Sequence, residues 1–213
     1  MKKKFGLIIF ALMMGAICTY LFHGETKAED TQKEIAGKVL RFHVLANSDS
    51  EEDQDLKMKV KEAVVSYLDS CLNDKGLTLE ETKSIVESRK EEVIQLAEHV
   101  IRENGYNYSV TAELTTDYFP IKSYGDVTLP AGEYEAFRIE IGNAEGKNWW
   151  CILYPPLCFV DASYGYVPED SKKMLSDVLS EDCYRAVTGG GASEGTVEVR
   201  FKIWDIIRDK LFK

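Results

Sequence analysis

The sequence VLRFHVLANSDS, residues 39–50, predicts a β-strand that turns directly into a helix. Its first part is mostly apolar, as in a buried strand, and its last five residues are typical of a turn. Because side chains alternate along a strand, Arg41 and His43 should share one face while Phe42 and Val44 take the other. The stretch therefore predicts two polar side chains on one side of a strand, next to a turn.

Two helices should follow this strand. Ser48 with Glu51, and Thr78 with Glu81, have the spacing of a capping box, in which each side chain bonds the other residue's backbone amide. Behind each box, apolar residues recur at three- and four-residue steps, which places them on one helix face. We expect the two helices to pack as a pair. The apolar positions span residues 56–71 in the first helix and 79–101 in the second.

Strands dominate the rest of the chain, and the expected class is α+β. The arrangement would be an N-terminal strand and a two-helix pair packed on a mainly antiparallel sheet, with a further helix and a short C-terminal helix. The second and third of the later strands should form a hairpin. These elements are expected as strands at residues 106–114, 134–141 and 148–154, a loop at 119–132, a helix from Pro168, a strand at 197–203 and a helix at 204–212.

The first 28 residues have the pattern of a signal peptide or an N-terminal membrane anchor. Lys2, Lys3 and Lys4 precede an uncharged apolar run, and this basic flank at the terminus favours export over a buried core helix. Cleavage stays open, because the only small-x-small site is weak and the run is nearly long enough to span a bilayer. Residues 29–37 then read as a linker, and residues 38–213 as a single exported domain.

The composition is acidic, with 26 Lys and Arg against 36 Asp and Glu and a net charge of -10. Removal of residues 1–28 takes four lysines and one glutamate, which changes this charge to -13. Such a surface repels phosphate groups, so nucleic acid and anionic lipid are not expected as main partners. With three His and five Cys, a His-rich metal site or a dense disulfide scaffold is not expected either.

His43, Ser48 and Asp49 have the residue types of a hydrolytic triad. However, Ser48 lies in no Gly-x-Ser-x-Gly elbow, and its capping role already explains it. We therefore favour a polar strand face beside a capped turn and predict no catalytic residue. An extracytoplasmic hydrolase that uses these three residues is the alternative.

No cofactor or metal site is predicted. The acidic residues Asp49, Asp53 and Asp55 lack the glycine and the final glutamate of a calcium-binding loop. Cys151 and Cys158 do not have zinc-ligand spacing. These two thiols could form a disulfide across the intervening prolines, pair with Cys71 or Cys183, or be small buried hydrophobic residues.

Trp149 and Trp150 are adjacent on a predicted strand and should point to opposite faces. One can fill the core, while the other is either covered by the rest of the chain or serves as an anchor for a partner.

Two long motifs resemble the stage II sporulation protein R family. The first runs over residues 41–50 and continues over 53–60, and the second runs over 146–161. Residues 199–204 are similar to the C-terminal end of that family. The resemblance extends over residues 39–203.

The resemblance implies a signalling protein rather than an enzyme. Family members are made in the forespore of endospore-forming bacteria and exported toward the space between forespore and mother cell. There they trigger a membrane-embedded aspartic protease of the mother cell, which matures a sigma-factor precursor. Membrane contact would involve the N-terminal segment only. A structural envelope protein is a further alternative. The residues we expect to serve both the fold and the partner are Arg41, His43, Asn47, Ser48, Asp49, Trp149 and Trp150.

Overall fold

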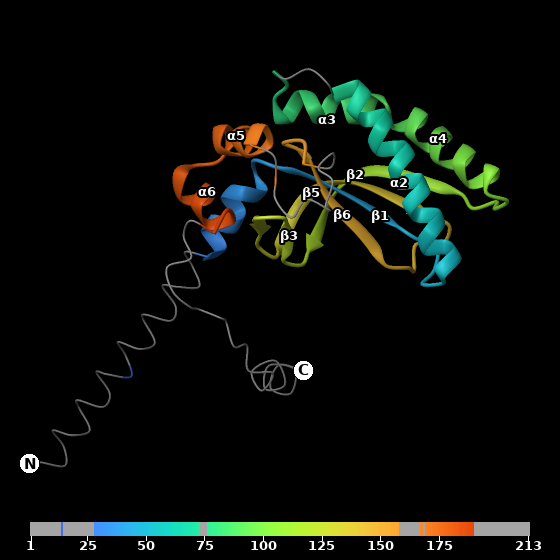
Figure 1. The fold of residues 1–213 in the computed structure, drawn as a ribbon, viewed down its shortest axis with the longest axis horizontal. Helices are drawn as coiled ribbons and strands as arrows, with labels where there is room; N and C mark the ends of the chain where they lie inside the picture. Colours follow the sequence, from blue (N-terminus) through green and yellow to red (C-terminus); the bar gives the residue numbers. More distant parts are fainter. Residues whose placement is uncertain (1–13, 15–27, 73–75, 158–166, 168, 190–213) are drawn as a thin grey trace, which may run out of the picture.

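The computed structural model describes residue 14 and residues 28–72, 76–157, 167 and 169–189 (Figure 1). The predicted leader therefore lies outside the described residues except for Met14 and Ala28. The strand expected at 197–203 and the helix expected at 204–212 also lie outside them. In the described part of the chain, no helix has the length and apolar character needed to cross a membrane.

Four strands form the main sheet, in the order β2-β5-β1-β6. Strand β1 runs parallel to β5 and antiparallel to β6, and β2 is antiparallel to β5. The α+β class with a mainly antiparallel sheet is thus confirmed. The expected hairpin between β5 and β6 is wrong, because β1 lies between these two strands. The strand bounds are Leu40–Leu45 (β1), Val110–Phe119 (β2), Gly132–Ile141 (β5) and Asn148–Tyr154 (β6).

Three helices cover one face of the sheet (Figure 1). They are α2 (Glu51–Leu72), α3 (Leu79–Ser88) and α4 (Lys90–Glu103). The apolar face of α2 packs with Phe42 and Val44 of β1 into one core. The second predicted helix is divided at Arg89, so the expected pair is in fact three helices.

One of the two predicted capping boxes is present. At α3, the Glu81 amide donates to the Thr78 hydroxyl over 3.3 Å and the Thr78 amide donates to the Glu81 carboxylate over 2.8 Å. At α2, the cap is Ser50, whose hydroxyl accepts from the Asp53 amide over 3.2 Å. The expected box of Ser48 and Glu51 is therefore wrong. Ser48 bonds the Asp53 side chain instead.

A second core lies on the other face of the sheet, toward one end of the molecule. It is covered by a helix at residues 28–36, by α5 (Glu169–Val178) and α6 (Glu181–Val187), and by a hairpin of β3 (Lys122–Tyr124) and β4 (Val127–Leu129). This helix lies where a linker was expected. Its residue Ile35 is fully buried in the second core, so the segment is part of the packed domain. The hairpin occupies the expected loop. Both elements have too few apolar residues to give a clear periodicity.

Candidate functional site

The predicted alternation of β1 is confirmed. Leu40, Phe42 and Val44 join the core under the helices. Arg41 and His43 lie on the opposite face, which is the face with the second core. The sheet thus holds two buried polar side chains on the side away from α2 and α4.

Arg41 is fully buried in a box of aromatic rings. Its guanidinium carbon lies 4.2 Å from the ring centre of Phe119 and 5.0 Å from that of Tyr134. Its Nε donates to the Cys151 carbonyl over 3.2 Å and its Nη2 donates to the Tyr124 hydroxyl over 2.9 Å. Burial lowers the pKa of Arg41. In this box the cation is held by ring faces and neutral acceptors, so Arg41 connects β1 to the β3–β4 hairpin.

His43 is at the centre of a row of side chains that crosses all four strands. The residues directly opposite one another are Glu113 on β2, Arg138 on β5, His43 on β1 and Trp150 on β6. The imidazole stacks on the Trp150 indole, with ring centres 5.0 Å apart and an angle of 7° between the planes. Its Nε2 lies 3.0 Å from the Asp117 carboxylate.

Burial holds His43 neutral. It lowers the pKa of the imidazole, although the neighbouring Asp117 carboxylate acts in the opposite direction. A neutral ring that donates from Nε2 to Asp117 leaves Nδ1 as an acceptor. The neighbouring Asn148 side chain also acts to raise the pKa of the imidazole, against the effect of burial.

Arg138 joins three carboxylates on the same sheet face. It pairs with Asp117 over 3.0 Å, with Glu140 over 3.3 Å and with Glu113. Burial opposes the charge of the guanidinium, but the three carboxylates outweigh this effect and raise the pKa of Arg138. With His43 neutral, this cluster carries one positive and three negative charges and is thus locally acidic.

Asn47, Ser48 and Asp49 form a latch between the β1–α2 turn and the loop at residues 142–147. The Asn47 and Ser48 side chains donate to the buried Asp53 carboxylate over 2.8 and 2.6 Å. Burial opposes the charge of Asp53, but these hydrogen bonds prevail and lower its pKa.

Asn47 and Asp49 of the latch also bind the backbone of the loop at residues 142–147. Asn47 Oδ1 accepts from the Asn143 amide over 3.0 Å, and Asp49 accepts from the Lys147 amide over 2.7 Å. Gly142 has a φ of +59°, and a Cβ there would lie 2.2 Å from Asn47 Oδ1. The latch residues therefore hold the chain's own backbone in place.

The hydrolytic arrangement that was considered as the alternative is not assembled. His43 bonds Asp117, Ser48 bonds Asp53, and Asp49 bonds the loop. No hydrogen bond joins any two of the three candidate residues in the described part of the chain. Likewise, no group of three or more His, Cys, Asp or Glu is placed to hold a metal ion within the described ranges.

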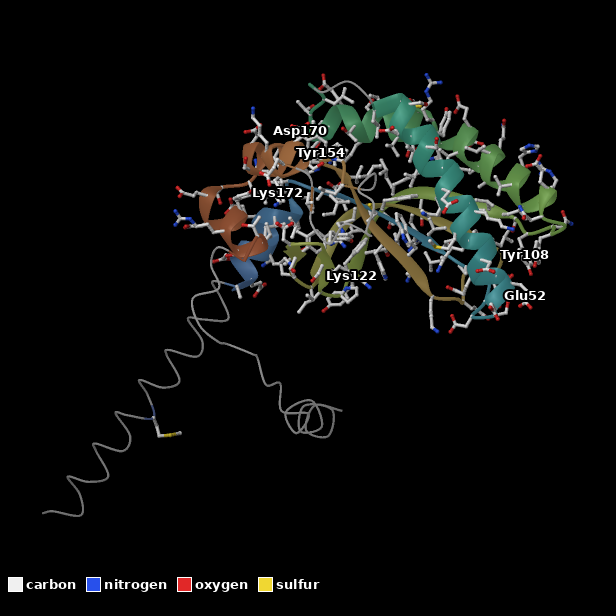
Figure 2. The ribbon with its side chains drawn as sticks, in the orientation of Figure 1. Glu52, Tyr108, Lys122, Tyr154, Asp170 and Lys172 are labelled. Carbon is white, nitrogen blue, oxygen red and sulfur yellow. The ribbon has the colours of Figure 1, made fainter. Side chains whose placement is uncertain are left out.

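The tandem tryptophans point to opposite faces, as predicted. Trp149 contacts Phe42 edge-on, with ring centres 5.9 Å apart, and lies 5.1 Å from the Lys61 ammonium on α2. Trp150 packs on His43 and lies 6.0 Å from the Lys122 ammonium on β3, the residue labelled below the sheet in Figure 2. Both indoles are half-buried, so each retains some exposed surface.

Cys151 is buried and disulfide-bonded, whereas Cys71 and Cys183 are free. Cys158 lies outside the described residues, so its pairing with Cys151 stays a prediction.

Sequence reasoning missed the charged partners of His43. Asp117, Arg138, Glu113 and Glu140 lie on strands far from β1 in the sequence. The available signal was alternation: Arg138 is the one basic residue in β5, and Glu113 and Asp117 are two positions either side of Thr115 in β2. Only the strand register brings them together.

The fold and site define an α+β domain in which the unusual polar residues bind one another and the backbone. The profile of the family described as stage II sporulation protein R matches residues 36–164. The Stage II sporulation protein R of Bacillus subtilis (strain 168) is 34% identical over 219 residues, which cover 95% of each chain. The chain belongs to the stage II sporulation protein R family. No solved structure matches it.

Proposed function

We propose that the chain is an exported intercellular signal of sporulation. It leaves the forespore, acts in the space between forespore and mother cell, and activates a membrane-embedded aspartic protease. The protease then matures a sporulation sigma-factor precursor. The single observation that carries this proposal is family membership over most of the chain. The basic and apolar N-terminal pattern supports export.

Activation requires that the chain bind the active state of the protease more tightly than the inactive state. Of the seven residues expected to serve the partner, Asp49 is exposed, and Asn47, Ser48, Trp149 and Trp150 are half-buried. We assign direct contact to Asp49, Trp149 and Trp150, because the Asn47 and Ser48 side chains are already bound to Asp53. The buried Arg41 and His43 act through the shape of the sheet, and Asn47 and Ser48 through the latch.

Co-expression of the chain, the protease and the sigma-factor precursor in a non-sporulating host tests the proposal. Processing of the precursor should require both this chain and its residues 1–28. A folded Ser48→Ala variant should still support processing, because it loses two internal hydrogen bonds, to Asp53 and from Ser50, but no catalytic group and none of the three residues assigned to direct contact. Processing that proceeds equally without this chain overturns the proposal. Loss of processing in a Ser48→Ala variant that is exported and folded would favour the hydrolase alternative.

A further inference from the structure

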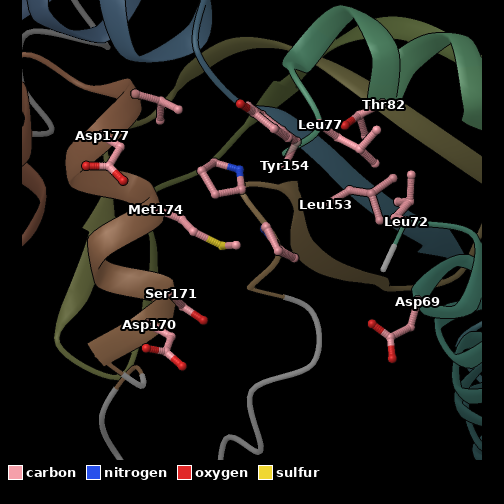
Figure 3. A pocket seen from close by; sticks show the side chains of 13 residues that line it. Asp69, Leu72, Leu77, Thr82, Leu153, Tyr154, Asp170, Ser171, Met174 and Asp177 are labelled. Atoms are coloured by element: carbon pink, nitrogen blue, oxygen red, sulfur yellow. The ribbon is translucent and has the colours of Figure 1, made fainter. Parts of the chain in front are cut away.

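A cavity of about 380 Å³ lies where α2, α3, β6 and α5 meet. Its walls are mainly apolar, and Figure 3 shows Met174 extending from α5 into the cavity, across from Leu72 and Leu153. Mainly apolar cavities of roughly 300–1,000 Å³ are typical binding sites for small ligands and side chains. None of the residues discussed above as the candidate site lines this cavity, so it is a separate feature of the fold.

Three carboxylates stand at its rim. Asp69 lies near the end of α2, and Asp170 and Asp177 lie on α5, about two turns apart and so on one side of the helix. All three are exposed, and none forms an ion pair with a described residue. Among the described residues that line the cavity, none is a lysine or an arginine. The neighbouring Lys172 is already paired with Asp126 and Glu169.

We propose that this cavity binds a peptide segment in which one or two large apolar side chains are flanked by lysine or arginine. The apolar side chains gain by leaving water for the walls. The flanking cations meet three carboxylates that form no ion pair within the described part of the chain. An acidic segment would be repelled by the three carboxylates. A simple cation would make no contact with the apolar walls. The charge at the rim thus selects among the apolar segments that could enter.

The occupant is a segment on the outer face of the membrane protease, so this inference rests on the proposed function. It deepens that function by naming the chemistry of the contact. The acidic balance of the whole chain, with its net charge of -10, agrees with a basic partner surface.

Calorimetric titration of the full-length chain in phosphatidylcholine nanodiscs tests the cavity directly. The probes are the blocked peptides Lys-Leu-Phe-Lys, Glu-Leu-Phe-Glu and Lys-Gly-Gly-Lys. The first should bind, the second should not, and the third should bind at least tenfold more weakly. Raising the salt concentration should weaken the binding of Lys-Leu-Phe-Lys, because exposed charge pairs are screened.

The decisive variant combines Asp69→Asn, Asp170→Asn and Asp177→Asn. It should weaken binding of Lys-Leu-Phe-Lys about tenfold at low salt, since each exposed charge pair contributes a few-fold. Its matched control combines Glu51→Gln, Glu52→Gln and Asp55→Asn, which removes the same charge. Figure 2 shows Glu52 at the opposite end of the domain from Asp170. If both triple variants bind Lys-Leu-Phe-Lys equally weakly, the peptide is attracted only by the net charge of the domain, and the proposal is overturned.

The chain's own last four residues, 210–213, also read Lys-Leu-Phe-Lys. A Lys210→Glu, Lys213→Glu variant should bind the probe unchanged. If its affinity for the probe rises, the chain's own end occupies the cavity and the partner assignment is wrong.

The co-expression assay separates this inference from the proposed function. The cavity variant should lower precursor processing at least fivefold, and the control variant should not. If both variants process normally while processing still requires the chain, the cavity assignment fails and the proposed function stands. If the wild-type chain drives no processing, the proposed function fails and the assignment of the occupant fails with it.

Discussion

Gly146→Ala should destabilise the fold, because the loop at residues 142–147 has no room for a side chain at this position. A Cβ there would lie 2.2 Å from the Ser48 carbonyl oxygen and 2.9 Å from the Ala46 side chain. The first contact is with backbone, which cannot rotate away as a side chain can. The loop must therefore move off the β1–α2 turn.

The cost follows from the hydrogen bonds that this movement breaks. The amides of Gly146, Glu145 and Lys147 donate to the turn over 2.9, 3.3 and 2.7 Å. At about 1 kcal/mol for each hydrogen bond, the free energy of unfolding should fall by about 3 kcal/mol. That is a large part of the roughly 5–15 kcal/mol that stabilises a typical domain.

Urea denaturation followed by circular dichroism measures this loss. Gly37→Ala is the matched control, because the nearest atom to its new Cβ is 3.6 Å away and its backbone conformation suits other residues. The control should be neutral or stabilise the fold by up to about 1 kcal/mol. A loss below about 1 kcal/mol in Gly146→Ala, or equal losses in both variants, would refute the account of the loop.

Three further predictions concern buried charge. Asp53→Asn should lower the free energy of unfolding by about 2 kcal/mol at neutral pH, because Asn47 and Ser48 lose a charged acceptor. Since the pKa of Asp53 is lowered, the difference from wild type should shrink as the pH falls below about 3.8. A difference that stays constant with pH in urea titrations would contradict this. Because the pKa of His43 is lowered from 6.5, the unfolded chain binds a proton at a higher pH than the folded chain does, so stability should decline as the pH falls below about 6.5. His43→Phe should remove this part of the decline in thermal melts. An unchanged pH profile would exclude His43 as its source. Arg138→Met leaves Asp117, Glu113 and Glu140 without their cation, so it should lower the free energy of unfolding by about 2 kcal/mol at low salt and by less at high salt. An equal loss at both salt concentrations would argue against charge repulsion.

Local signals in the sequence predicted the elements well. The apolar stripe of α2, the capping box at Thr78 and the opposed faces of Trp149 and Trp150 each depend on neighbours within a few residues. The β5–β6 connection shows the limit of such signals. A short loop with two glycines indicates that the chain reverses, but it does not indicate whether another strand enters between the two. Here β1 enters, from about 100 residues earlier.

The candidate site was predictable only in part for the same reason. His43 and Trp150 were identified separately, each by its unusual position on a strand. That they stack on one another, with Arg138 alongside, depends on the register of β1 with both of its neighbours. The latch shows a different failure: Ser48 satisfied a helix-capping pattern, yet Ser50 lies closer to the first turn of α2 and takes that role.

The central position of β1 has a consequence for how the chain folds. This strand is the first of the sheet to be synthesised, but its two partners end at Ile141 and Tyr154. Until those residues are available, both sides of β1 expose unpaired backbone groups that invite association with other chains. Contacts this distant in sequence also form slowly. The sheet therefore cannot be completed strand by strand as the chain is synthesised. In a chain that ends before β6, the most buried strand, β1, would become an exposed edge strand.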